Sequence, residues 1–142
     1  MRITKSFLIL GIVGLILLYG CNNNVDLVTP SLSDSLIENT PAIVNKQDNF
    51  TFAVKAKNYD ETFDYTLTLN SKILEIAFTI GNYSSGSIVI DIYNQGNNKI
   101  FQGNYVGGVT LVQGVTTETF PTKIHFTLTK VSASVSLAIK AK

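Results

Sequence analysis

In the stretch FTFAVKAK, residues 50–57, apolar and mostly polar side chains alternate. Phe50, Phe52, Val54 and Ala56 fall on one side of an extended chain, and the intervening side chains fall on the other. Successive side chains of a β-strand point to opposite faces, so this period of two predicts a strand with one buried face.

The same alternation recurs along the rest of the chain. Weaker apolar runs near 99–106 and 109–115 lie between the clear ones, and segments rich in Asn, Gly and Ser separate them, as turns require. The clearest further sets are Phe63, Tyr65, Leu67 and Leu69; Leu74, Ile76, Phe78 and Ile80; Ile88, Ile90 and Ile92; Ile124, Phe126 and Leu128; and Val135, Leu137 and Ile139.

These segments predict about eight strands at roughly ten-residue spacing and no long helix. We therefore expect an all-β domain over residues 48–142, built as two packed antiparallel sheets in an immunoglobulin-like or jelly-roll-like sandwich. A small barrel is the alternative. The Ser-rich last strand, which ends at Lys142, has the composition of a protected sheet edge. No family resemblance is found for this domain.

The N-terminus has a different composition. Arg2 and Lys5 precede an uncharged apolar run of 13 residues, Phe7–Tyr19. A helix needs about 20 apolar residues to cross a bilayer, so this run fits the apolar centre of a signal peptide better than a permanent span. We expect residues 1–20 to be removed on export.

The end of this run resembles the lipobox of bacterial lipoprotein precursors. Leu18, Gly20 and Cys21 match that pattern, whereas Tyr19 departs from it because the middle position is usually small. The resemblance covers only the first 21 residues. It implies that the chain is cut before Cys21 and that the Cys21 sulfur receives a diacylglyceryl group, with acylation of the new amine as a further step. Two or three acyl chains make a stable membrane anchor.

Residues 21–47 read as the lipidated N-terminus followed by a tether. They are rich in Asn, Ser, Thr and Asp, and Pro30 and Pro41 interrupt regular structure. We thus expect the domain to lie outside the cytoplasm on a lipid-anchored chain in the bacterial cell envelope, at the outer membrane or cell surface if the host has one.

Composition narrows the range of functions. Loss of Arg2 and Lys5 with the signal peptide turns the net charge of +1 into −1, and a chain so poor in positive charge is a poor match for nucleic acid. One Cys cannot form an intramolecular disulfide. One His and one Cys are too few ligands for zinc or another transition metal, and we expect no cofactor.

His125 and a cluster of acidic residues are two candidate polar sites. His125 is the sole His and lies on the polar side of a Thr-rich strand without an acidic neighbour in sequence, which favours a solvated histidine over a catalytic one. Asp60, Glu61 and Asp64 lie beside Asn58 and offer oxygens to calcium, but without the spacing of a calcium loop. We expect ordinary solvated carboxylates there and no catalytic residue.

Exposed aromatic rings are the remaining candidates for ligand binding. Tyr59, Tyr83, Tyr93 and Tyr105 fall in or near predicted turns, where they could form a shallow surface for stacking on sugars. The alternative is that tyrosine suits strand ends, with a half-buried ring and a solvated hydroxyl.

The expected function is that of a non-enzymatic binding or structural module of the envelope. Its partners would be the membrane, through Cys21, and a polysaccharide or an envelope protein. An accessory subunit of an envelope complex is one alternative, and a small carbohydrate-active hydrolase is another.

Overall fold

The computed structural model describes residues 36–142, which form six β-strands and no helix. The expectations for the signal peptide, for Cys21 and for most of the tether concern residues outside this range. The strands are β1 (Ala42–Asn45), β2 (Asn49–Thr66), β3 (Ile73–Asn94), β4 (Lys99–Tyr105), β5 (Val109–Thr116) and β6 (Pro121–Ala141). Across this range no helix of the length and apolarity needed to span a membrane is found.

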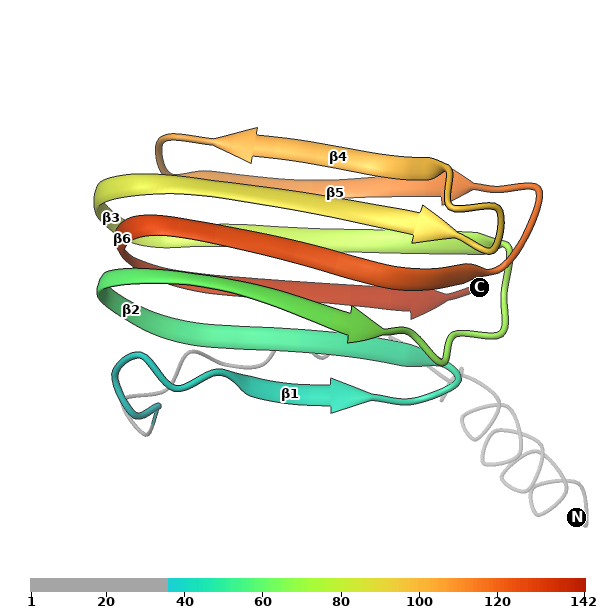
Figure 1. Cartoon of the computed structure of the whole chain (residues 1–142), viewed down its shortest axis with the longest axis horizontal. Helices are drawn as coiled ribbons and strands as arrows, with labels where there is room; N and C mark the ends of the chain where they lie inside the picture. Colours follow the sequence, from blue (N-terminus) through green and yellow to red (C-terminus); the bar gives the residue numbers. More distant parts are fainter. Residues whose placement is uncertain (1–35) are drawn as a thin grey trace, which may run out of the picture.

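All six strands belong to one antiparallel sheet. Its order is β1-β2-β6-β3-β4, and β5 also pairs with β3. The last strand, β6, therefore lies in the centre of the sheet between β2 and β3, and not at an edge as its composition predicted. Figure 1 shows why one sheet suffices: β2, β3 and β6 all bend back at the same end of the molecule.

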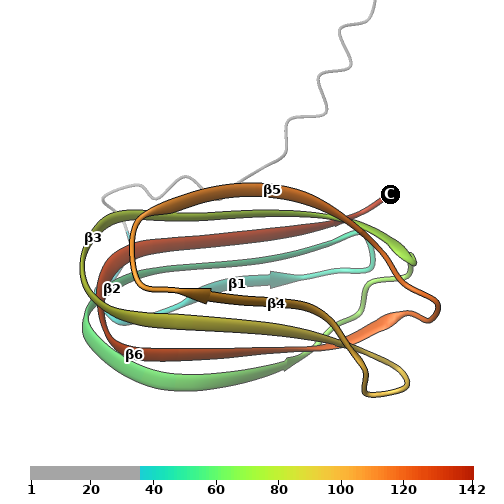
Figure 2. The same cartoon turned by 90° about the horizontal axis from the view of Figure 1, so that it is seen from above.

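The bends fold the sheet into two layers that face one another (Figure 2). What we call the front layer contains β4 and the segments 61–66, 87–94 and 121–129 of the three long strands. The back layer contains β1, β5 and the other halves of the long strands, which pair through residues 49–56, 74–81 and 133–141.

Backbone conformation explains the common position of the bends. Each long strand carries a residue with positive φ there: Asn58 in β2, Asn82 and Gly86 in β3, and Lys130 in β6. The pairing register also shifts at these points, as in β-bulges. At Gly86 a Cβ would lie 2.6 Å from the carbonyl oxygens of Thr129 and Lys130, so only glycine fits this approach of β3 to β6.

The core fills the space between the layers. Its members come from the apolar side of each alternating segment, and the rings of Phe52 in the back layer and Phe126 in the front layer stack at 4.4 Å. The largest fully buried side chains are Phe50, Phe52, Phe78, Phe126, Leu74, Ile76, Ile88, Ile90, Ile92, Ile124, Leu128 and Leu137.

The prediction of an all-β antiparallel domain is confirmed. The count of about eight strands and the division into two separate sheets are not. Three pairs of predicted strands are continuous through the bends, because local bulges and positive-φ residues turn the chain without ending its pairing. The structure also adds β1, which lies within the range 21–47 assigned to the tether. Its four residues are all exposed and give no inward-facing pattern.

Candidate functional site: the outer face of the front layer

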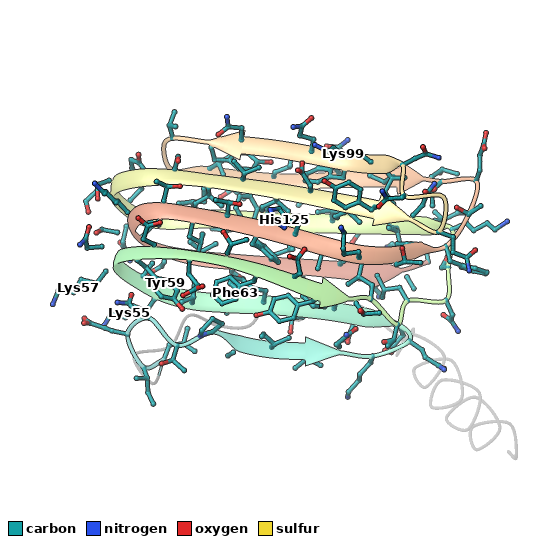
Figure 3. All side chains as sticks on the ribbon, viewed as in Figure 1. Lys55, Lys57, Tyr59, Phe63, Lys99 and His125 are labelled. Atoms are coloured by element: carbon teal, nitrogen blue, oxygen red, sulfur yellow. The ribbon has the colours of Figure 1, made fainter. Side chains whose placement is uncertain are left out.

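The outer face of the front layer carries a row of polar side chains in register. Asp64 on β2 pairs with His125 on β6, His125 pairs with Asp91 on β3, and Asp91 pairs with Gln102 on β4. Residues directly opposite in an antiparallel pair lie on the same face of the sheet. Four strands thus place two carboxylates, an imidazole and an amide side by side, and His125 marks the middle of this face in Figure 3.

His125 is held by hydrogen bonds on both ring nitrogens. Its Nδ1 lies 3.0 Å from Oδ1 of Asp64, and its Nε2 lies 3.2 Å from Oγ1 of Thr127. An ionised carboxylate only accepts hydrogen bonds, so Nδ1 is the nitrogen that donates to Asp64, and Nε2 is the nitrogen that faces the Thr127 hydroxyl. His125 is therefore an oriented imidazole and not a freely solvated one, although its side chain is 29% exposed.

Asp91 is the buried charge of the row. The residue is only 7% exposed, and its Oδ2 forms an ion pair with Nζ of Lys99 at 3.0 Å. The hydroxyl of Tyr93 lies 3.4 Å from the same oxygen. The other oxygen, Oδ1, is buried without a hydrogen-bond partner among the described residues. Because burial of an unsatisfied acceptor is costly, Asp91 carries an unused capacity to accept a hydrogen bond.

Tyr93 lies beside this row, between two cations. Nζ of Lys123 is 4.5 Å from the centre of the Tyr93 ring and Nζ of Lys99 is 5.9 Å away, both within the range of cation–π attraction. These contacts hold the half-buried Tyr93 ring between two ammonium groups.

The face presents hydrogen-bonding groups beside one aromatic ring. Thr127, His125 and Asp64 form a chain of hydrogen bonds like that of a hydrolytic triad, and such a triad also needs preorganised donors for an oxyanion. The backbone N–H groups of β6 and β3 lie in strands that pair on both sides, whereas β4 and segment 61–66 of β2 pair on one side only among residues 36–142. Around this chain the face presents carboxylate, amide and ammonium groups.

The structure does not bring the four predicted tyrosines together. Tyr83 and Tyr105 pack against the core; the hydroxyl of Tyr83 donates to the carbonyl oxygen of Gly86, and the ring of Tyr105 lies 4.8 Å from that of Phe78. Tyr59 packs on Phe63 at 6.1 Å near the bend. Of the four, Tyr93 lies beside the polar row.

Burial affects three tyrosine hydroxyls. Desolvation raises the pKa of Tyr105, and desolvation followed by the nearby Glu61 carboxylate raises the pKa of Tyr59. Desolvation and then Tyr59 raise the pKa of Tyr65. These hydroxyls therefore keep their protons above the ordinary tyrosine range.

The acidic cluster is spread along β2 and does not form a site of its own. Asp64 turns to His125, and within residues 36–142 no three His, Cys, Asp or Glu side chains gather closely enough to hold a metal ion. Cys21 lies outside the described residues.

Sequence reasoning missed Asp91, Lys99 and Gln102 as members of this face. Asp91 interrupts the apolar run 88–92 at an outward position, which is a usable sign of an exposed strand face. Nothing in the sequence, however, places it opposite His125.

Comparisons with known proteins add no family. No model of a protein family matches the chain, and no curated protein matches it. Among solved structures, a Bacillus endospore appendage that forms disulfide-linked pili matches with 16% identity and a TM-score of 0.44, over 76% of this chain and 97% of that one.

Two further matches cover only small parts of larger chains. The enzymatically active domain of tailspike protein 4 of bacteriophage CBA120 has 15% identity and a TM-score of 0.34, over 68% of this chain and 17% of its own. The capsular polysaccharide assembling protein CapF of Staphylococcus aureus has 8% identity and a TM-score of 0.31, over 72% and 29%. With identities of 16% or less and TM-scores of 0.44 or less, these matches assign the chain to no family.

Proposed function

We propose that this chain is a lipid-anchored protein of the bacterial cell envelope whose β domain binds a ligand without chemical conversion. In this proposal residues 1–20 are the signal peptide, Cys21 carries the lipid, and the two layers serve as a β-sandwich scaffold of the immunoglobulin-like or jelly-roll-like kind. The binding surface is the outer face of the front layer.

The observation that carries the proposal is the in-register row Asp64–His125–Asp91–Gln102 beside Tyr93. Its donors and acceptors are held by neighbouring side chains and supported by strands packed on a large core. Rigid elements that hold polar groups in place favour specific binding, because little conformational freedom is lost when the ligand arrives.

A polysaccharide is the ligand that this chemistry fits best. Sugar hydroxyls both donate and accept, and they match carboxylate, amide and imidazole partners. The C–H side of a sugar ring is apolar enough to pack on an aromatic face such as that of Tyr93. Asp91 Oδ1 has no hydrogen-bond partner within residues 36–142, and it accepts a ligand hydroxyl in this proposal when the side chains around it move aside.

A glycan array probed with the purified protein tests this proposal. We expect binding to a restricted set of glycans that is lost in Tyr93→Ala and reduced in Gln102→Ala. The matched control is Thr110→Ala on β5, an exposed position in the other layer, which should bind as the parent does. An array that is blank for the parent protein, or binding that survives Tyr93→Ala, would remove the front face as a glycan site.

Lipid attachment is tested separately, in cells. The parent protein should incorporate a clickable fatty acid, and Cys21→Ser should not, because a hydroxyl cannot form the thioether. A mature protein that still begins at Met1, or labelling that persists in Cys21→Ser, would refute the anchor.

An accessory subunit is the second candidate, and strand β1 favours it. Among residues 36–142, β1 pairs with β2 alone, and its Ile43 and Val44 are 40% and 42% exposed. An unpaired strand edge can accept a strand from a partner chain. Cross-linking from position 43 or 44 in the native envelope should then capture one defined protein, and no specific product would count against this candidate.

A further inference from the structure

A hollow lies at the bend, on the outer side of the back layer and away from the front face. It has a volume of about 230 Å³. Figure 3 places Lys55 and Lys57 at this end of the molecule. The side chains that matter for its chemistry are Glu38, Lys55, Lys57, Asn82, Ser132 and Ser134.

Beside the hollow, one strand position has no side chain. Lys55, Ser134 and Gly81 lie directly opposite one another across β2, β6 and β3. A Cβ at Gly81 would meet no heavy atom within 4 Å, so the space beside Ser134 is open. The opposite wall is held in place by Asn39, whose side chain accepts from the Lys57 N–H at 2.8 Å and donates to the Lys57 carbonyl at 3.1 Å.

The hydrogen-bonding groups of the hollow are mostly donors. Oγ of Ser132 accepts the Asn58 N–H at 2.9 Å, and Oγ of Ser134 is 3.5 Å from the Asn82 amide nitrogen. Each hydroxyl uses its oxygen as an acceptor, and among the described residues neither has an acceptor for its own proton. Two O–H donors are thus left over beside the ammonium groups.

The charge of the hollow is positive. Lys55 has no ion-pair partner within residues 36–142, whereas Lys57 lies 3.6 Å from Glu38. That pair is loose and its side chains are 73% and 49% exposed, so it contributes little and exchanges readily. Two ammonium groups against one carboxylate leave a net charge of +1.

We propose that this hollow binds a small oxyanion, a phosphate or carboxylate group carried by an envelope molecule. The oxyanion accepts from the Ser132 and Ser134 hydroxyls and pairs with Lys55, and Lys57 moves from Glu38 to complete the site. Charge-assisted hydrogen bonds of this kind are roughly twice as strong as neutral ones. This site is separate from the glycan surface proposed above and does not depend on it.

The test is a titration of the full-length protein in nonionic detergent, followed by the backbone amide signals in NMR spectra. The probes are inorganic phosphate and D-glucuronate, with D-glucose as the neutral control, up to about 10 mM. Vesicles with and without phosphatidylglycerol distinguish a lipid headgroup from a soluble source. Binding should shift the amides of Ser132, Ser134 and Asn58.

Two variants test the site in different ways, one by removing a positive charge and the other by adding a negative charge. Lys55→Gln removes the unpaired charge and should weaken binding about tenfold. Gly81→Asp adds a carboxylate to the open space beside Ser134 and should abolish binding. Lys46→Gln, at an exposed loop position outside the hollow, is the control for total charge and should bind as the parent does. Unchanged far-UV circular dichroism shows that each variant is folded.

The outcomes separate clearly. Saturable shifts with either anion, lost in both variants and kept in Lys46→Gln, support the site and identify its preferred group. No shift with either probe or with anionic vesicles overturns the proposal. Equal shifts with glucose, or shifts that survive Gly81→Asp, overturn it as well.

Discussion

The two layers share one core but present different outer faces. The front layer carries the charged and aromatic row around His125, Asp91 and Tyr93. The equivalent positions in the middle of the back layer are small: Ala53, Ala77, Ser136 and Ala138, each at most 6% exposed. Inward positions in both layers are apolar, so the two layers differ mainly in the chemistry of their outer positions.

The charged side chains on the outer side of the back layer lie towards its ends. Lys55 and the two serines lie at the bend, and the Glu75–Lys142 ion pair lies at the opposite end. The two candidate sites therefore occupy different parts of the sheet: a flat surface on the front layer and a hollow where the strands turn. Stability measurements on variants in the core, at the bend and on each outer face test how far the two layers depend on one another and how far their outer faces differ.

The largest effect is expected from Phe126→Ala. Phe126 is fully buried and stacks on Phe52 across the layers, so truncation leaves a cavity where the layers meet. The free energy of unfolding should fall by about 4 kcal/mol in urea denaturation. Thr129→Ala, exposed on the outer side of the same strand, should change it by less than about 0.5 kcal/mol. Similar losses from both variants would contradict this account of the core.

Gly86→Ala should destabilise the bend by about 3 kcal/mol. The alanine would adopt a φ of 96° and place its Cβ against the β6 backbone, which forces β3 and β6 apart in both layers. Gly81→Ala is the matched control, because its Cβ meets open space and its backbone is unstrained. If both glycine variants unfold at the same urea concentration, Gly86 does not determine the bend.

The two ion pairs compare the outer faces directly. Lys99→Met leaves the Asp91 carboxylate buried without its cation and should lower stability by about 2 kcal/mol, less than for a fully buried pair because the Lys99 side chain is 35% exposed. Lys142→Met removes the partner of Glu75, in a pair with side chains 44% and 29% exposed, and should cost less than about 1 kcal/mol. Equal costs in thermal unfolding would mean that the front face is no more organised than the back.

The smallest effect concerns alkaline pH. Burial raises the folded-state pKa of Tyr65 and Tyr105 above 10.0, so the folded protein holds these protons more tightly than the unfolded chain. Stability from this source is complete below pH 10 and is lost as the pH rises from 10 through the folded-state pKa.

We therefore expect a shallow decline in unfolding free energy above pH 10, smaller in the double variant Tyr65→Phe, Tyr105→Phe. Tyrosinate absorbance should also appear at higher pH in the folded protein than in urea. Coincident titration curves for the folded and unfolded protein would contradict this.

Much of the fold could be predicted from the sequence, because the polarity of each residue largely determines whether its side chain is buried. The alternation in 50–56, 74–80 and 135–139 correctly predicted which side chains enter the core, and the turn residues correctly marked most changes of direction. The predicted number of strands was wrong because three strands continue through the bends. Asn58, Asn82 and Gly86 carry the signs of ordinary turns, and a turn that keeps its strand paired has the same local composition as one that ends it.

The candidate binding surfaces could be predicted from the sequence to a much smaller extent. The sequence indicates Tyr93 through its aromatic ring, but it favours a solvated His125 because no acidic residue lies near it in sequence. Its partner Asp64 is 61 residues away. The hollow at the bend likewise depends on strand pairing, which places Lys55 of β2 and Gly81 of β3 on either side of Ser134 of β6.

Alternation and composition were enough to show that the domain is β, which face of each strand is buried, and that reactive groups are few. Both act locally, residue by residue. The bending of one sheet into two layers, the central place of β6 and the meeting of particular polar residues come from the folded arrangement. Alternation fixes the face on which a side chain lies, whereas its neighbours on that face depend on strand order and register, which packing of the whole core selects.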